Sequence, residues 1–469
     1  MKSIKDDFCG YLEIENNKYA YNISNDLVTM LPAQSESQRK YESFNCLMIH
    51  NTDAPEYFYG EDDNTKIAIL CKGKFVTSPI GISVSAKFKT PIIVKSSGNA
   101  DGFGNRLTAP WNKFHTITFY GGSINAIYDP VAAIEPINYS ECFGGNKEIK
   151  LRSWNDYSYE TFFQIEDKEI TLILSIGLKN KKGSENNASC NLGELDSYIR
   201  FSFADEQGFE EIEKYYVIAR RLVAILTQQN NVFFEEVYLS QRDSENKLFK
   251  TAMCKIFSPY ENYSLKRKDK VIQMLSVFKN IPELVNGIVD GKADTLFELL
   301  PEDNKWVNRI SIKNLQDLCT ALEVAYNLDN NRKREKDELI KELKSAIKNT
   351  IKEFIDAHEE IDVDKETTIT SAFRYLDFTL KQKILTLYNE NKNLADKIVS
   401  KYTLPEINED STASFVKLRD VKTHSGRVEL DETARLYYPL FAIVYACFLR
   451  YVGVSDEQIE SILLQVFWK

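Results

Sequence analysis

The sequence predicts an α+β protein of several domains, in which a β-rich, sandwich-like region precedes an all-α helical bundle. Two observations predict this order. Short runs rich in β-branched and aromatic residues follow one another to about residue 205, whereas amphipathic segments with helical spacing dominate beyond residue 245. The 469 residues are enough chain for about three domains, and 43% hydrophobic residues is a globular composition. We therefore expect a β-rich domain over 1–244, a helical bridge over 245–299 and a helical domain over 300–469.

The first region carries the strand signals. Runs of β-branched and aromatic residues bounded by turn residues predict strands at 67–70, 82–85, 91–94, 170–174 and 198–203. A hairpin is expected where 115–120 and 124–128 flank the glycines at 121–122, because glycine adopts the positive φ of tight turns at low cost. A helix over 210–229 and a strand over 232–239 then close this domain.

The second region is predicted to be helical. Amphipathic spacing, with capping residues at several ends, predicts helices at 304–327, 333–357, 369–399, 412–423, 433–452 and 455–467. A charged connector at 266–270 precedes them, and no repeat of fixed period is present.

Charge and apolar runs limit the partners. A formal charge of −10 argues against broad, non-specific binding to nucleic acid, but it leaves room for a small basic cleft. The N-terminal residues have no apolar signal core, and the longest apolar run, 436–449, is shorter than the roughly 20 residues that cross a bilayer. We therefore expect a cytoplasmic protein without a membrane partner, with that run forming a buried helix.

The cysteines give no sign of a metal site. All eight lie far apart and none forms a CxxC pair, so structural zinc and a disulfide framework are both disfavoured. The pattern predicts buried, reduced thiols, and we expect neither a metal nor another cofactor.

The most informative motif lies near the C-terminus, where Arg419 precedes His424 by five positions. Imidazole and guanidinium together can cut RNA without metal, because the imidazole moves the proton between the 2′-hydroxyl and the leaving oxygen while the guanidinium holds the phosphate. We expect a short helix with the histidine at its exit, ended by Ser425 and Gly426. Five helical positions span about 140° around the axis, so the two side chains converge only if the helix ends between them.

This segment resembles the ApeA-like branch of the HEPN superfamily, whose signature is an arginine, a polar residue, a few more residues and then a histidine. Here these are Arg419, Asp420, the residues at 421–423, and His424. A second segment, 314–323, is similar to the first helix of that branch, where members carry an inward-facing glutamate, here Glu323. The resemblance covers about 300–469. Members often have asparagine after the arginine, so Asp420 makes this site more negative.

The resemblance implies a function. Members of this family are metal-independent endoribonucleases of anti-phage abortive infection that leave a 2′,3′-cyclic phosphate, and they dimerise so that two motifs face each other. The implied partners are therefore RNA, either tRNA or another cellular RNA, a second copy in a homodimer or dimer-based oligomer, and a phage-derived trigger that the β-rich domain senses. The implied roles are general acid/base for His424, phosphate clamp for Arg419, and orienting groups for Asp420 and Glu323.

A second class of function stays open. The helical domain can instead be an inactive HEPN module for dimerisation or docking, with the β-rich half binding a protein or a carbohydrate. Other motifs favour structural roles. We expect a flexible loop at 98–106 and not a phosphate cradle, and a core or interface role for His115 and not a ligand role. We likewise expect a solvated acidic loop at 356–364 and not a cation site, and a mixed solvated face at 331–334 and not a phosphate contact.

Overall fold

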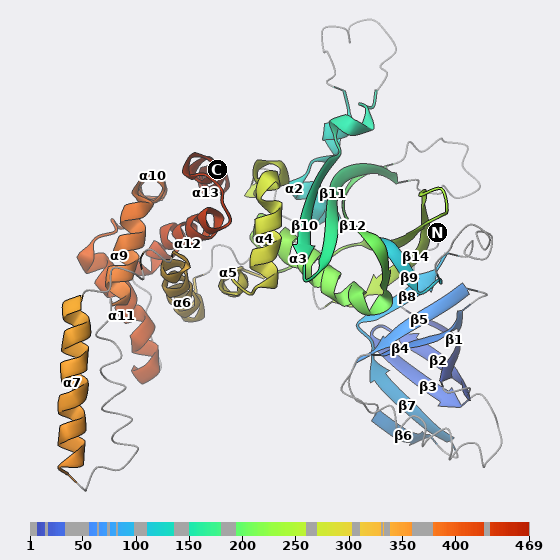
Figure 1. Cartoon of the computed structure of the whole chain (residues 1–469), viewed down its shortest axis with the longest axis horizontal. Coiled ribbons are helices and arrows are strands. Elements are labelled where there is room, and N and C mark those ends of the chain that lie inside the picture. Colours follow the sequence, from blue (N-terminus) through green and yellow to red (C-terminus); the bar gives the residue numbers. More distant parts are fainter. Residues whose placement is uncertain are drawn as a thin grey trace, which may run out of the picture. The chain divides into compact units, whose positions relative to one another are not determined.

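The computed structural model describes residues 7–14, 17–32, 56–62, 65–72, 76–80, 83–97, 110–135, 150–179, 194–258, 270–302, 310–329, 332, 338–358, 379–425 and 432–468. The chain divides into two compact units (Figure 1). The sheet unit comprises Met1–Lys268 and Gln273–Val289, and the helical unit comprises Asp269–Ile272 and Asp290–Lys469. The predicted α+β class, with a β-rich region before a helical one, is confirmed.

The sheet unit is built on one antiparallel sheet. In the described residues it has fourteen strands, in the spatial order β10 (Tyr159–Ile165), β11 (Lys168–Lys179), β12 (Glu194–Gly208), β9 (Lys113–Tyr120), β13 (Glu236–Arg242), β14 (Leu248–Ile256), β8 (Ile92–Ser96), β5 (Thr65–Cys71), β4 (Glu56–Asp62), β1 (Asp7–Ile14), β2 (Asn17–Ser24), β3 (Leu27–Pro32), β7 (Ser83–Lys89) and β6 (Val76–Ile80). The described residues of the runs predicted at 67–70, 82–85, 91–94, 170–174 and 198–203 lie in or directly beside β5, β7, β8, β11 and β12, whereas the strand predicted at 232–239 begins only at Glu236, as β13. Because β14 pairs with both β13 and β8, all the strands belong to one continuous hydrogen-bonded sheet. They do not form the two separately bonded sheets of a sandwich.

Two apolar cores lie on this sheet. One is formed by β1 to β5, β7 and β8 and includes Leu12, Tyr19, Phe58 and Ile67. The other lies where α3 (Ile212–Thr227) packs on β9 and β12, with the Tyr215 ring 4.6 Å from that of Phe203. The helix predicted at 210–229 is thus confirmed as α3, preceded by a short 3-10 turn.

The hairpin predicted after β9 is wrong in its second half. Residues Gly122–Ile127 form a short helix, α2, and not a strand. The side chains of Ile124 and Ile127 are both buried, as their helical spacing allows, and Asn125 bonds through its side chain to Asp196 and to the backbone of Ser197. These bonds to β12 hold a helix where local turn signals favour a strand.

The expected boundary at residue 244 is also wrong, because the sheet continues into β14 (Leu248–Ile256). A tight turn joins β13 to β14: the Asp243 carboxylate accepts hydrogen bonds from the backbone N–H groups of Glu245 and Lys247, and Asn246 adopts a left-handed φ of 63°. The helical part of the expected bridge begins later, and its helix α4 (Ile281–Val289) packs on α3 and β10 in the sheet unit.

The helical unit is assembled around two central helices. α6 (Ile312–Leu328) packs against α5 (Asp294–Leu299), α9 (Leu380–Glu390), α11 (Glu409–Ser425) and α12 (Tyr437–Tyr451), and α12 also contacts α10 (Lys392–Tyr402) and α13 (Asp456–Trp468). The apolar run at 436–449 is buried in α12, as predicted. The single helix predicted over 369–399 is instead two, α9 and α10, which meet at the buried Asn391.

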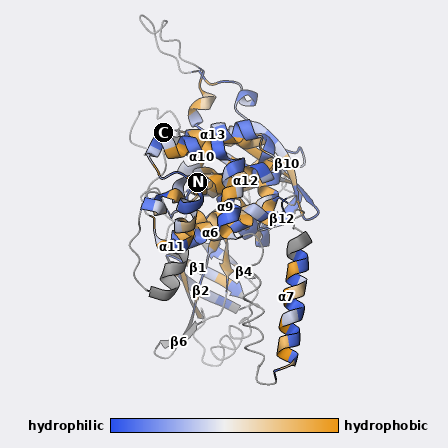
Figure 2. Ribbon diagram, turned by 90° about the vertical axis from the view of Figure 1, so that its left-hand side faces the viewer, coloured by the Kyte–Doolittle hydropathy of each residue, from blue (hydrophilic) through white to orange (hydrophobic). Residues whose placement is uncertain are grey.

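One helix of this unit has apolar side chains that are exposed or only half-buried. α7 (Glu338–Asp356) carries hydrophobic and hydrophilic residues side by side along its length (Figure 2), and none of its residues from 341 on is buried. Within the described residues, no helix is long and apolar enough to cross a membrane.

Candidate functional site

Helix α11, which carries the Arg419 and His424 motif, is started by Asn408. The Asn408 side-chain oxygen accepts hydrogen bonds from the backbone N–H groups of Asp410, at 3.0 Å, and Ser411, at 2.9 Å. This is the pattern of an N-cap, and it satisfies donors that the first helical turn leaves without intrahelical partners. The helix therefore begins three residues before the start predicted at residue 412.

The helix runs without a break through the whole motif. The described part of α11 reaches Ser425, and Arg419, Asp420 and His424 all belong to one continuous helix; Gly426, where the stop was predicted, lies outside the described residues. The condition for convergence within one chain, a helix end between the arginine and the histidine, is not met: their positions lie about 140° apart around the axis. The side chains of these three residues lie outside the described part of the chain.

Glu323, the other predicted site residue, lies on α6. This helix starts at a capping box in which the Ser311 hydroxyl accepts a hydrogen bond from the backbone N–H of Asn314 at 3.2 Å, and the Asn314 side chain accepts one from the backbone N–H of Ser311 at 3.0 Å. Glu323 is half-buried beside the fully buried Leu322. Because α6 packs against α11, the fold brings the glutamate's helix and the motif's helix together.

A second carboxyl on α6 has a shifted pKa. Burial raises the pKa of Asp317, and the nearby Lys313 only partly opposes this shift. Asp317 also contributes, after burial itself, to raising the pKa of Tyr437 on α12, so the two side chains interact. Charge pattern alone does not single out Asp317, because its shift comes from burial between helices.

Arg332 joins α6 to α9 and has a structural role. The Arg332 side chain is only 11% exposed, forms a two-pronged ion pair with Glu390, and donates to the carbonyl oxygens of Ala325 and Tyr326 at 3.1 Å. It therefore caps the C-terminal end of α6. The mixed solvated face predicted at 331–334 is wrong for this residue, whose neighbours at 331, 333 and 334 lie outside the described part.

Asn391, which follows Glu390 in the sequence, joins α9 to α12. Its side-chain amide donates to the Leu387 carbonyl at 2.8 Å and accepts from the Arg450 guanidinium at 3.0 Å. Burial raises the pKa of the adjacent Cys447 thiol to about 11, although Arg332 and Arg450 favour its thiolate. The cysteine is thus an inert core residue.

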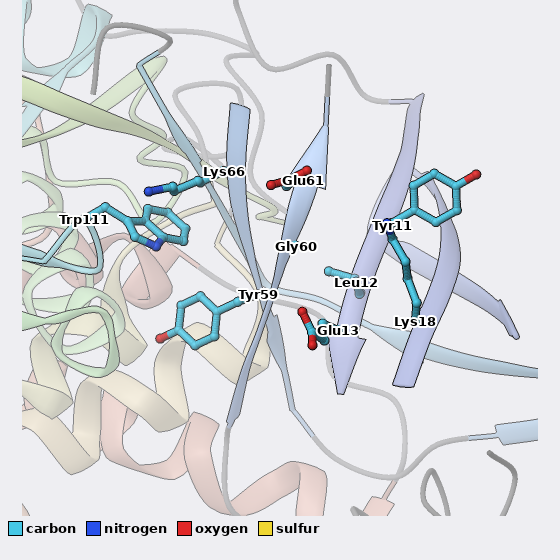
Figure 3. A pocket seen from close by; sticks show the side chains of 9 residues that line it. All are labelled: Tyr11, Leu12, Glu13, Lys18, Tyr59, Gly60, Glu61, Lys66 and Trp111. Carbon is cyan, nitrogen blue, oxygen red and sulfur yellow. The ribbon is translucent and has the colours of Figure 1, made fainter. Parts of the chain in front are cut away.

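The sheet unit contains a shallow hollow that the sequence did not predict. Its volume is about 540 Å³, and it is lined by residues of β1, β2, β4, β5 and the segment before β9 (Figure 3): Tyr11, Leu12, Glu13, Lys18, Tyr59, Gly60, Glu61, Lys66 and Trp111. Figure 3 shows Glu13 and Glu61 between the Tyr11 and Lys18 pair on one side and Tyr59, Trp111 and Lys66 on the other. We call this feature the aromatic hollow.

The strand register explains how the aromatic hollow arises. Tyr11 lies opposite Glu61, and Glu13 opposite Tyr59, so alternation along the strands puts all four on the face away from the buried Leu12. Two glycines fix this register. A Cβ on Gly60 would lie 2.1 Å from the Tyr11 carbonyl oxygen, and one on Gly10 would lie 2.2 Å from that of Glu61, so β1 and β4 approach too closely for any larger residue.

His115 lies at the edge of the sheet's second core and is half-buried. Its Nδ1 accepts a hydrogen bond from the Arg242 backbone N–H at 3.3 Å. Burial, reinforced by the Arg242 charge, lowers its pKa, while Glu206 and Asp205 oppose the shift. These contacts agree with the structural role predicted for this histidine.

The remaining sequence candidates offer little chemistry in the described residues. The loop at 98–106 lies outside them, as do 359–364 of the acidic loop. Among the residues that the structure describes, no cluster of three or more histidine, cysteine, aspartate or glutamate side chains is arranged to hold a metal ion. Of the described cysteines, Cys71, Cys254, Cys319 and Cys447 are buried and form no disulfide, as predicted, whereas Cys9 forms no disulfide but is exposed.

No protein-family model matches the chain, and neither the curated proteins nor the solved structures contain a match.

Proposed function

We propose that this protein is a metal-independent endoribonuclease that cuts cellular RNA in the cytoplasm as part of anti-phage abortive infection. The observation that carries the proposal is the packing of α6 against α11. The helix that carries Glu323 therefore lies beside the helix that carries Arg419 and His424, although about ninety residues separate these segments in the sequence. These are the two segments in which the chain resembles the ApeA-like HEPN branch.

The site is composite and needs two chains. Because the positions of Arg419 and His424 lie about 140° apart on one helix, a single copy presents only part of the catalytic set to a given phosphate. Two copies with their motifs face to face supply an imidazole and a guanidinium on each side of the RNA strand. The partner of the helical unit is thus a second copy of the chain.

The chemistry follows from these two groups. The His424 imidazole takes the proton of the 2′-hydroxyl, the 2′-oxygen attacks phosphorus, and the bond from phosphorus to the 5′-oxygen breaks as the imidazolium returns the proton to that oxygen. Arg419 donates to the non-bridging oxygens and stabilises the phosphorane charge. The products are a 2′,3′-cyclic phosphate and a free 5′-hydroxyl. Asp420 and Glu323 orient the imidazole and the guanidinium, and the sheet unit senses the phage-derived trigger.

The first prediction tests the motif directly. Purified protein incubated with total RNA, including tRNA, in EDTA should cleave it and leave cyclic phosphate ends, and His424→Ala and Arg419→Ala should each lower the rate by about 100-fold or more. Lys417→Ala, an exposed position on the same helix, is the matched control and should cut at the wild-type rate. Circular dichroism and melting curves check that all three variants fold. If the His424→Ala variant cut RNA at the wild-type rate, His424 would not be a catalytic residue.

The continuity of α11 and the acidic Asp420 favour a second candidate, a helical docking module without catalysis. A negative charge beside the arginine weakens its hold on a polyanion, and a regular helix supplies no turn to bring the two side chains together. The same EDTA assay separates the two functions, because a docking module leaves RNA uncut at any protein concentration and in the presence of phage extract.

A further inference from the structure

We propose that the aromatic hollow is a binding site for a neutral carbohydrate chain. Its volume, about 540 Å³, lies within the range of roughly 300 to 1,000 Å³ typical of small-ligand sites. The inference goes beyond the proposed ribonuclease function and does not depend on it, since every residue involved belongs to the sheet unit.

The first step is the presence of accessible aromatic faces. Tyr11 is 50% exposed and Tyr59 is 38% exposed, although tyrosines on a sheet commonly pack most of their ring against neighbours. Trp111 holds Tyr59 in place, with an edge-to-face contact at 5.8 Å, and is itself fixed by an edge-to-face contact at 5.4 Å with the buried Phe209. The C–H groups on one face of a sugar ring carry a partial positive charge and stack on such electron-rich rings.

The second step is the ring of polar groups between these aromatic faces. Glu13 and Glu61 are exposed carboxylates that lie between the tyrosines (Figure 3), and across the strands each faces a lysine, Lys18 and Lys66 respectively. Carboxylates accept and ammonium groups donate, so adjacent sugar hydroxyls find both kinds of partner. The Lys18 ammonium lies over the Tyr11 ring, 4.8 Å from its centre, so it covers part of that ring and leaves Tyr59 as the main stacking surface.

The balance of charge disfavours a nucleic acid. Two lysines and two glutamates line the hollow, which gives a formal charge of zero at the site in a chain whose total is −10. A polyanion needs an excess of cations, because phosphate neutralisation supplies most of its affinity. A polyhydroxyl ligand without charge has no such requirement.

The place of the hollow in the sheet disfavours an extended peptide. β1 and β4 are interior strands, each bonded to a neighbour on both sides, so their backbone groups are already used. A peptide that adds a strand needs a free sheet edge. The ligand therefore meets side chains on a sheet face, which suits stacked sugar rings.

The experiment uses the full-length protein and three neutral hexasaccharides, cellohexaose, chitohexaose and maltohexaose, with hexauridylate as the anionic probe. Calorimetry and tryptophan fluorescence should show millimolar or tighter binding of at least one hexasaccharide, unchanged by salt because the ligand carries no charge. Tyr59→Ala and Glu61→Gln should each weaken binding about tenfold. Phe162→Ala, which removes an exposed ring on β10 at 58% exposure, is the matched control and should bind normally.

Three outcomes would overturn the proposal. One is the absence of binding to all three hexasaccharides at millimolar concentration by a folded protein. Another is binding that persists unweakened in Tyr59→Ala and Glu61→Gln. The third is salt-sensitive binding of hexauridylate that Tyr59→Ala abolishes, which would make the hollow a nucleic-acid site. The aromatic substitutions remove exposed rings, so each variant should retain the sheet, which circular dichroism checks.

Discussion

At the scale of single residues, His115 is the clearest titrating group in the sheet unit. Its neutral imidazole accepts the Arg242 backbone N–H, and burial together with the Arg242 charge lowers its pKa below the usual value near 6.5. Between the lowered folded-state pKa and the usual pKa near 6.5, this histidine is protonated in the unfolded chain but neutral in the folded chain. The free energy of unfolding should therefore fall as the pH drops from about 7 through the lowered folded-state pKa.

The second prediction is that His115→Gln makes this fall shallower. Glutamine keeps an acceptor for the Arg242 N–H but carries no titrating group. The measurement is the free energy of unfolding by urea at several pH values for both proteins. Near pH 8, where the imidazole is neutral in both states, the difference between the two proteins should be constant and serves as the internal control. Equal slopes between about pH 5 and 7 would exclude His115 as a source of the pH dependence.

Residue chemistry was more predictable than residue environment. The motif at Arg419 and His424 is visible in the sequence because it depends on side-chain type and spacing. The structural role of Arg332 cannot be seen in the sequence, because it depends on Glu390, which lies 58 positions away. The aromatic hollow was missed for the same reason: Tyr11, Tyr59 and Trp111 are ordinary residues of separate segments until the register of β1 and β4 brings them together.

At the scale of elements, Arg332 links two helices. It donates to carbonyl oxygens at the C-terminal end of α6 and pairs with Glu390 at the end of α9. Removing this arginine, which is only 11% exposed, leaves these acceptors without their donor, which costs more than the ion pair itself contributes. Glu390 is 34% exposed, so water replaces part of what it loses.

The third prediction is that Arg332→Ala lowers the free energy of unfolding of the helical unit by about 1–3 kcal/mol. Lys381→Ala is the control, since it removes the exposed pair with Glu409 at 3.1 Å and should cost less than about 0.5 kcal/mol. Urea titration followed by the helical circular dichroism signal gives both values. Equal effects of the two substitutions would show that the Arg332 network adds nothing beyond a surface ion pair.

Elements were predicted well where one periodicity dominates and poorly where a long-range contact decides. α3 and α12 have strong apolar stripes or runs, and both are found as expected. The residues of α2 have strand-like composition, yet bonds from Asn125 to β12 favour a helix. Asn391 ends α9 and starts α10 because its amide bonds to the Arg450 side chain on α12, a contact that no local window contains.

At the scale of the whole molecule, the proposed site requires a second chain. The fourth prediction is that the protein forms a dimer, or an oligomer built from dimers, through the helical unit. Light scattering on the full chain should give a mass at least twice that of one chain at the concentration used for RNA cleavage. The specific activity should fall on dilution as the dimer dissociates. A monomer that still cuts RNA at full rate would exclude the composite site.

The unit boundary was the part of the architecture least accessible to sequence. Charge and periodicity change near residue 245, but β14 follows that point and is held by β13 and β8, so the sheet unit extends into the helical stretch as far as Val289. Sequence composition reports local structure, whereas a unit ends where long-range contacts end. A fragment cut at 245 would therefore carry β14 without its partner strands.

The fifth prediction concerns the division of labour between the units. His50 and His115 are the only histidines before residue 240, and His115 is bonded within the sheet, so the proposed chemistry belongs to the helical unit alone. A fragment of 290–469 should keep the ribonuclease activity of the full chain, or exceed it where the sheet unit restrains the nuclease, and its expression should harm the host cell. The His424→Ala version of the same fragment is the control and should be harmless. Circular dichroism and light scattering first establish that both fragments are folded and dimeric. If such a fragment is inactive, or if the two fragments are equally toxic, the sheet unit takes part in the chemistry and the assignment of catalysis to α6 and α11 has to be replaced.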